Sequence, residues 1–433
     1  MDTNLSTVDK IKQHLQRSVE LASAKNRYAS WRRDCPIFTN LDFLYSGIAR
    51  AINCVESGRD FLQFSDEVLN NPIAHSTYFD ALHSSTRLQL VKDVEEQSYK
   101  IHSDLLASLG VDYLSEYPDL DGYHVEALDG HFSDHACHTA KNDKGRVFAA
   151  GTIYSINMRN GLMRPFCLVT NGTLKSHEGP VFRRYMEQAN KCTKAKELKR
   201  ISIYDKAMNN YKWWSDQTLQ QHYMISMLKS NATIGEGTKI EFDKEHKVNV
   251  GITSYAKHRK GTSSFNVIRY VDPETEVEHV FITTLPPSVN PGTIAMLYYK
   301  RWTIEKAFNN YKSDMKEKKA WSSAPVALNI QSRCTTMAYN TMRVLEETAQ
   351  AAKPKLVHPS ANKYHKNLEE KQIIAVGKGR FVNPLHFGIR IARIKSHTFR
   401  SVRNAIIAAT KYEELINRLI RKLVQPLPLA AER

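Results

Sequence analysis

Apolar residues recur at helical spacing through the first part of the chain, where runs of alternating apolar and polar residues are few. Spacing of three and four residues places apolar side chains on one helix face. Serine or asparagine precedes several of these runs, as is typical of helix N-termini. The pattern predicts helices over residues 8–24, 42–54, 65–69, 76–90 and 88–109. We therefore expect an all-helical N-terminal domain over residues 1–118, ending at the turn signal Tyr117-Pro118-Asp119.

The pattern then changes to short apolar runs with strand-like composition and turn residues between them. Asn160-Gly161 separates two such runs and is typical of a two-residue hairpin turn. The predicted elements are strands over 123–129, 146–158 and 162–170, a helix over 179–196, a strand over 200–204, a helix over 209–219 and a strand over 223–228. Three strands, a helix, a strand, a helix and a strand form the pattern of a ribonuclease-H-like α/β core, which we place in residues 119–232.

Residues 233–285 are rich in threonine, valine, isoleucine, phenylalanine and glycine, and turn signals divide them. This composition predicts a β-rich insertion in the core. Residues 286–330 would return to the core with a helix over 293–316. Residues 331–433 read as a basic helical C-terminal region, whose final helix over 401–424 stops before Pro426. The predicted fold class is thus α/β, with helical regions flanking a ribonuclease-H-like catalytic core.

Composition narrows the possible functions. The 433 residues are 42% hydrophobic and 24% charged, which is typical of a soluble globular protein. The formal net charge of +16 indicates an anionic partner, with nucleic acid as the first candidate, although a basic solvated surface without such a partner is the alternative. Basic residues recur along the whole chain, which favours a long polyanion.

The termini, apolar runs and cysteines bear on localisation. The N-terminus lacks the basic and apolar segments of a secretory signal, and no apolar run approaches the length of a membrane span. We therefore expect no membrane partner. The six cysteines are scattered without paired spacing, which favours a reducing cytoplasm over a disulfide framework.

One predicted helix near residue 300 carries a polar stripe, formed by Tyr298, Arg301, Glu305 and Lys312. At about 100° per residue their side chains fall within roughly 60° of arc. A phenol, a guanidinium, a carboxylate and an ammonium group make a poor core face. They suit a surface that holds a metal ion at its centre and a phosphate backbone along its length. The alternative for Glu305 is a surface ion pair with neighbouring basic residues.

Two aspartates end predicted strands of the core. Asp129 closes the first strand and Asp205 closes the fourth. A polar side chain that follows a buried strand lies at the sheet edge where open α/β folds collect ligands. Carboxylates that converge from separate elements can hold two divalent ions for phosphoryl transfer. The alternatives are a turn role for Asp129 before Gly130 and a helix N-cap role for Asp205.

The stripe, with Trp302 directly after Arg301, resembles the Tyr-Arg-Glu-Lys signature of DDE transposases from bacterial insertion sequences. Asp129-Gly130 resembles the first catalytic motif of that family. The lead-in at residues 281–285 is similar to the strand that precedes the signature, and the β-rich stretch matches the insertion of this branch. The resemblance covers about residues 120 to 320.

The resemblance implies specific roles. Asp129, Asp205 and Glu305 would be catalytic and would bind two Mg²⁺ ions, for which Mn²⁺ could substitute. Four residues would bind DNA. Tyr298, Arg301 and Lys312 would hold phosphates, and Trp302 would stack on a base.

The resemblance also implies a function. The protein would bind the terminal inverted repeats of its element, cleave the DNA at the ends and join the 3′ ends to target DNA, which is cut-and-paste transposition. Its partner would be double-stranded DNA, both element ends and target, held by a homodimer in a synaptic complex. Residues 1–118 would bind DNA, and residues 331–433 would serve DNA binding or dimerisation. The expected location is the bacterial cytoplasm, associated with the nucleoid.

Two features depart from the family pattern. Members often carry glycine and an aromatic residue shortly after the second aspartate, whereas Lys206-Ala207-Met208 follows Asp205. His131 stands after Asp129-Gly130 where a small hydroxyl residue is common. Two other functions therefore stay open: a non-catalytic DNA-binding protein derived from a transposase, and a ribonuclease-H-like nuclease without strand transfer.

Two other motifs are interpreted structurally. His131, His135, Cys137 and His138 lie close in sequence, but their spacing matches no zinc motif. Trp213-Trp214 is interpreted as core packing.

Overall fold

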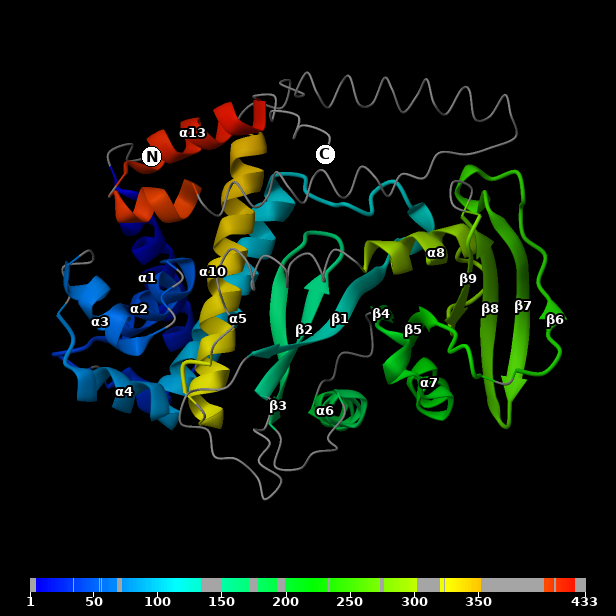
Figure 1. Ribbon diagram of the computed structural model, residues 1–433, viewed down its shortest axis with the longest axis horizontal. Helices are drawn as coiled ribbons and strands as arrows, with labels where there is room; N and C mark the ends of the chain where they lie inside the picture. The colour runs from blue at the N-terminus through cyan, green and yellow to red at the C-terminus, as the bar shows by residue number, and fades with distance from the viewer. Residues whose placement is uncertain are drawn as a thin grey trace.

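The structure is a computed structural model of the chain (Figure 1). It describes residues 5–33, 35–53, 55, 57–67, 72–133, 150–170, 178–192, 199–232, 234–272, 276–301, 320–322, 324–351, 401–408 and 410–424. Within these ranges a group of helices packs beside one nine-stranded, mostly antiparallel sheet (Figure 1). The fold class is therefore mixed α/β.

The N-terminal region is helical, as predicted. Its helices are α1 (Thr7–Lys25), α2 (Asn40–Asn53), α3 (Gly58–Glu67), α4 (His75–His83) and α5 (Ser85–Ser108). The single helix predicted over 76–90 is wrong, because the Ser84 hydroxyl caps a new helix by accepting from the Arg87 amide at 3.3 Å. The helix predicted over 65–69 begins earlier, at Gly58.

The sheet joins the predicted core to the predicted insertion. Its strands are β1 (Tyr123–Ser133), β2 (Ala150–Asn157), β3 (Met163–Thr170), β4 (Lys199–Ile203), β5 (His222–Met227), β6 (Thr238–Lys239), β7 (Ile252–Lys260), β8 (Ser263–Val271) and β9 (Glu278–Thr283). Their order is β3-β2-β1-β4-β5-β9-β8-β7-β6, with β1, β4 and β5 mutually parallel. Since β9 pairs with β5, the β-rich segment extends the same sheet.

The hairpin between β2 and β3 lies where Asn160-Gly161 predicts it, but its loop is longer than two residues. The Asn157 amide donates to the Leu162 carbonyl at 2.9 Å, so four residues separate this pair. Asn157 Oδ1 accepts from the Arg159 amide, Asn160 Oδ1 accepts from the Leu162 amide, and Gly161 adopts a φ of 74°. The prediction of a two-residue turn is wrong because asparagine side chains close a wider loop with local hydrogen bonds.

Helices cover both faces of the sheet. On one face, α6 (Glu178–Cys192) and α7 (Tyr211–Thr218) bury a cluster that contains Leu128 of β1 and Met224 of β5. Trp213 and Trp214 belong to this cluster, so their interpretation as core packing is confirmed. On the other face, α8 (Pro291–Lys300) packs over Ala127 of β1 and its neighbours. The alternation of side chains along β1 thus separates two different environments.

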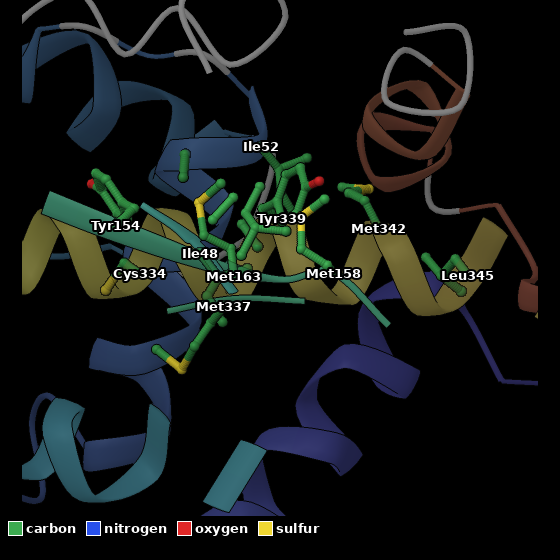
Figure 2. Close-up of a cluster of buried hydrophobic side chains, with 14 of the residues drawn as sticks. Ile48, Ile52, Tyr154, Met158, Met163, Cys334, Met337, Tyr339, Met342 and Leu345 are labelled. Atoms are coloured by element: carbon green, nitrogen blue, oxygen red, sulfur yellow. The ribbon is translucent and has the colours of Figure 1, made fainter. Parts of the chain in front are cut away.

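Helix α10 (Pro325–Ala351) lies between the helical region and the sheet (Figure 1). Figure 2 shows its Met337 and Met342 among buried side chains from α2 and the β2–β3 hairpin. The side chain of Asn340 forms two hydrogen bonds with the backbone of Met163 on β3. Its Oδ1 accepts from the Met163 N–H at 2.8 Å, and its Nδ2 donates to the Met163 carbonyl at 2.8 Å. The predicted boundary at 330/331 falls inside this helix, which shares one core with the N-terminal helices.

The C-terminal helix differs from its prediction. The pattern predicts one helix over 401–424, whereas residues 401–407 and α13 (Tyr412–Val424) form two separate helices. Between them, Lys411 forms a bridge with Ser6, and the Thr7 amide donates to the Thr410 carbonyl at 3.0 Å. Pairing with the N-terminal segment therefore interrupts the helix.

Candidate active site

Asp129 and Asp205 lie on neighbouring chain segments, but the prediction that Asp129 closes the first strand is wrong. Strand β1 continues to Ser133, because Asp129 and the four residues after it pair with β2. Asp205 follows β4, which ends at Ile203.

Strands β1 and β4 are parallel neighbours, and Ala127 pairs with Ile203. Each aspartate stands two residues beyond this pair: Asp129 is still within β1, whereas Asp205 lies past the end of β4. Because paired strands lie about 5 Å apart, the pairing brings both aspartates into the same region. Asp129 belongs to the face that buries Ala127, because side chains two residues apart in a strand point to the same face. Both aspartates are partly exposed.

Local hydrogen bonds orient each carboxylate. Asp129 Oδ1 accepts from the Gly130 amide at 3.0 Å. Asp205 Oδ1 accepts from the Lys206 amide at 2.7 Å and caps η3 (Lys206–Met208), so its predicted N-cap role is confirmed. A cap uses one carboxylate oxygen, and the second oxygen of Asp205 accepts no hydrogen bond from the described residues. Capping and metal binding are therefore compatible at this position.

Close packing fixes the start of α8, the helix that carries the predicted stripe. Pro291 occupies its first turn, and the Gly292 amide donates to Asn249 Oδ1 at 2.9 Å. A Cβ atom on Gly292 would lie 1.6 Å from the Val248 carbonyl oxygen, so only glycine fits. The helix therefore rests against the β-rich part of the sheet, and its last turn reaches the face that carries Asp129.

Arg301, at the end of α8, faces Asp129. Its Nη1 lies 3.8 Å from Asp129 Oδ2, and the Arg301 residue is only 5% exposed. Tyr298 is also 5% exposed; its ring centroid lies 5.3 Å from that of Phe281 and 5.3 Å from the Arg301 guanidinium carbon. The sequence predicts a polar stripe on a surface, whereas these two members are buried. Packing of α8 on the sheet turns them inward, since Tyr298 offers a large apolar ring.

The remaining predicted site residues, Trp302, Glu305 and Lys312, lie outside the described residues. So do His135, Cys137 and His138 of the histidine–cysteine cluster. Among the described residues, no group of three or more histidine, cysteine, aspartate or glutamate side chains has a geometry that could hold a metal ion. Asp129 and Asp205 are thus two of the three carboxylates of the predicted metal site, and the third, Glu305, lies outside the described residues.

His131 lies on the same face of β1 as Asp129, two residues further along. It is 3% exposed, and its ring centroid lies 6.4 Å from that of Tyr154 on β2. The sequence identifies His131 as a departure from a motif and as one member of the histidine–cysteine cluster, and neither observation predicts its burial. Its burial beside Asp129 comes from the pairing of β1 with β2, in which Tyr154 lies opposite Asp129.

A second polar group on β1 was not predicted. Glu126, on the opposite face from Asp129, is 6% exposed and accepts from the Ser202 hydroxyl at 3.0 Å. Ser202 Oγ also lies 2.7 Å from His222 Nε2. Burial alone raises the pKa of Glu126, but His124, 3.8 Å away, and Arg200 bring it down to about 2. Burial lowers the pKa of His222 to about 4.

In this group the serine stands between the acid and the imidazole. A nucleophilic triad instead needs the imidazole between the serine and the acid, so that it can accept the hydroxyl proton. Glu126, Ser202 and His222 therefore form a buried structural network that ties β1, β4 and β5 together. No local sequence pattern distinguishes Glu126 from a catalytic acid.

A family model for the transposase DDE domain matches residues 121–341, just over half of the chain. The chain therefore belongs to the transposase DDE domain family. The matched range contains all nine strands of the sheet, helix α8, Asp129 and Asp205.

No curated protein matches the chain. Among solved structures, it is similar to the piggyBac transposase in a synaptic complex with hairpin DNA, determined by cryo-EM. That similarity has 12% sequence identity and a TM-score of 0.36, and it covers 97% of this chain and 84% of the other. None of the described helices has the length and apolar character needed to cross a membrane.

Proposed function

We propose that this protein is a transposase that binds the terminal inverted repeats of its own element, cleaves DNA at the ends and joins the 3′ ends to target DNA. The observation that carries the proposal is that Asp129 lies on β1, next to the strand β4 that leads into Asp205, with buried Arg301 beside Asp129. Family membership supports the same reaction class. The formal charge of +16 suits a DNA partner.

The proposed catalytic core is ribonuclease-H-like. Its support is the strand order β3-β2-β1-β4-β5, with β2 antiparallel to β1 and with α6 and α7 leading into β4 and β5. This order brings the end of β4, which leads into Asp205, next to the part of β1 that carries Asp129. The β-rich segment then extends the sheet from β5 outward.

The residues present fit a pair of Mg²⁺ or Mn²⁺ ions. Asp129 and Asp205 offer carboxylate oxygens, the donors that hard divalent cations prefer, and both side chains are partly exposed. Glu305 is proposed as the third ligand. When bound, such ions supply Lewis-acid activation of the attacking oxygen and stabilisation of the leaving oxygen at phosphorus.

The basic residues of the stripe would act on the DNA and on the carboxylates. Arg301 holds the Asp129 carboxylate in place and, with Tyr298 behind it, would present its remaining donors to a phosphate near the cleaved bond. Lys312 would neutralise a neighbouring phosphate, and Trp302 would stack on an unpaired base. Two copies of the chain would hold two DNA ends together in a synaptic complex.

The direct test uses the DNA that flanks the reading frame. Imperfect inverted repeats there would supply the duplex for binding and Mg²⁺-dependent cleavage assays. We expect separate Asp129→Ala, Asp205→Ala and Glu305→Ala variants to lose cleavage while they still bind the ends. Cleavage that survives in any one variant would remove that residue from the metal site. Cleavage without joining of the 3′ ends would assign the protein to the nucleases instead.

A further inference from the structure

The connection between α1 and α2 presents basic and aromatic side chains to solvent. Arg27, Tyr28, Arg32 and Arg33 are all exposed within seven residues. Tyr28 is 97% exposed, which leaves a large aromatic ring almost entirely in water. Single exposed apolar groups are ordinary, but three arginines around an exposed tyrosine form a concentrated cationic surface. We call these four residues the α1–α2 basic loop.

Within the described residues, no carboxylate forms an ion pair with any of the three arginines of this loop. Asp93, on α5, is engaged by the Trp31 indole at 2.7 Å and by the Gln89 amide at 2.7 Å. Glu96 pairs with Lys25 at 2.5 Å. The neighbouring acids therefore serve the scaffold, and the guanidinium charges stay available to a partner.

The loop is anchored from below. Trp31, 1% exposed, sits between the arginines and packs into the helical core, and its carbonyl accepts from the Asn40 amide at 2.9 Å. Arg32 Nη1 donates to the Arg27 carbonyl at 2.7 Å, which closes the loop on itself. A backbone held this way loses little conformational entropy when the exposed side chains bind a partner.

The chemistry of the loop selects a phosphate polymer. Guanidinium groups match phosphate oxygens with two parallel hydrogen bonds, and tyrosine hydroxyls also donate to phosphates and sugars in protein–DNA complexes. Several arginines side by side can contact successive phosphates of one strand, a use that a single small anion does not need. We propose that the α1–α2 basic loop binds the sugar–phosphate backbone of duplex DNA and holds the element end on the helical region.

This assignment rests on the proposed function, since it specifies where the DNA is held. It places DNA binding apart from the metal site, because α5 and α10 stand between α1 and α2 and the sheet that carries Asp129 (Figure 1). Contacts to phosphate position DNA without reading its sequence. The loop should therefore change the affinity for all duplexes by a similar factor.

The test measures binding of the full-length protein to a labelled duplex by fluorescence anisotropy at several salt concentrations. Arg27→Gln/Arg33→Gln leaves the backbone hydrogen bond from Arg32 intact. We expect weaker binding and a plot of log affinity against log salt that is shallower by about 1.8, since each lost phosphate contact removes about 0.9. Tyr28→Ala should weaken binding about fivefold.

The matched control is Lys212→Gln/Lys239→Gln, which removes the same charge from two exposed lysines that are already paired with acids. It should bind with nearly the wild-type salt slope. Equal slopes for the loop variant and wild type would overturn the proposal. So would loop-dependent binding to vesicles of phosphatidylglycerol with unchanged DNA affinity, which would assign the loop to a lipid surface.

Failure of the loop and failure of the proposed function give different results. If wild type binds duplex DNA and the loop variant binds equally well, only the loop assignment fails. If wild type binds no duplex, or if Asp129→Ala still cleaves with Mg²⁺, the proposed function fails. With protein in excess, a correct loop assignment predicts that the loop variant still cleaves, because its metal site is unchanged.

Discussion

Glu126 and Asp129 lie three residues apart on β1, and the two faces of the sheet give their carboxylates different surroundings. Glu126 is buried and is held by Ser202, with His124 and Arg200 nearby. Asp129 is partly exposed on the opposite face, beside Arg301. One strand thus carries a carboxylate that stabilises the sheet and one that is open to a ligand.

The contrast shows how burial separates structural from functional acids. A buried carboxylate must be paired, because an unpaired charge in the interior is costly. A partly exposed carboxylate, such as that of Asp129, keeps oxygens that an incoming cation can reach. We therefore expect substitutions on the two faces to affect different observables, folding stability on one and metal-dependent cleavage on the other.

The largest effect is expected for Asp129→Asn. The change keeps the shape of the side chain but removes the charge that would bind a cation. Charge stabilisation by a bound metal is worth several kcal/mol, so cleavage should fall by roughly 10³-fold or more. The free energy of unfolding should change by less than about 1 kcal/mol. Cleavage assays and urea denaturation measure the two quantities, and a folded variant with wild-type cleavage would contradict the assignment.

The complementary change is Glu126→Ala, on the buried face. It leaves the Ser202 hydroxyl without its carboxylate acceptor and removes the negative charge near Arg200. Loss of one partner from such a buried group should lower the free energy of unfolding by about 2–4 kcal/mol. Cleavage per folded molecule should stay within about threefold of wild type, because Glu126 and Asp129 lie on opposite faces of the sheet and substitutions at sites that share no partners act independently. The comparison fails if cleavage falls as far as it does in Asp129→Asn.

A smaller effect is expected for Arg301→Lys, which keeps the charge but loses the planar fork. If Arg301 orients Asp129, cleavage and apparent Mg²⁺ affinity should both fall by about 10- to 100-fold, as is usual for residues that support metal ligands. DNA affinity measured without metal tests whether Arg301 also contacts a DNA phosphate. An unchanged Mg²⁺ dependence together with weaker DNA binding would place Arg301 on the phosphate alone.

The smallest effect concerns pH. The pKa of His222 is about 4 in the folded chain, whereas an unfolded histidine titrates near 6.5. Between these values the unfolded chain binds a proton that the folded chain does not, so stability falls as the pH is lowered from about 6.5 to about 4. The slope from this residue is at most about 1.4 kcal/mol per pH unit. Urea denaturation of His222→Gln should show a flatter profile over this window.

The lowered pKa of Glu126 acts at lower pH. Its folded value of about 2 lies below the ordinary value of 4.5, so its contribution is present above 4.5 and is lost as the pH falls toward 2. The acid limb of the stability profile should therefore have two parts. The first comes from the buried histidines, since burial lowers the pKa of His14 to about 4, as it does for His222, and also lowers the pKa of His102; the second comes from Glu126. A single transition in wild type and in both variants would contradict this separation.

Much of the fold follows from local patterns. Predicted helices over 8–24 and 42–54 match α1 and α2, and predicted strands over 200–204 and 223–228 match β4 and β5 within a residue or two. Errors fall where a local pattern continues through a break. Ser84 caps a second helix, and the segment at Lys411 pairs with Ser6. These breaks depend on a cap or on a distant strand-like partner, which apolar periodicity does not record.

The sequence by itself determined the order of helices and strands, the basic character of the chain and the position of Asp205 directly after a strand, whereas its expectation that Asp129 ends a strand is wrong. These properties are local, because periodicity and composition act over a few turns of chain. Only the tertiary structure decided that Arg301 turns inward to Asp129, that Glu126 is structural and that the β-rich segment continues the core sheet. These features depend on contacts between residues that are far apart in the sequence, such as Asp129 and Arg301, which are 172 positions apart. Such contacts are set by the packing of whole elements, which local periodicity does not record.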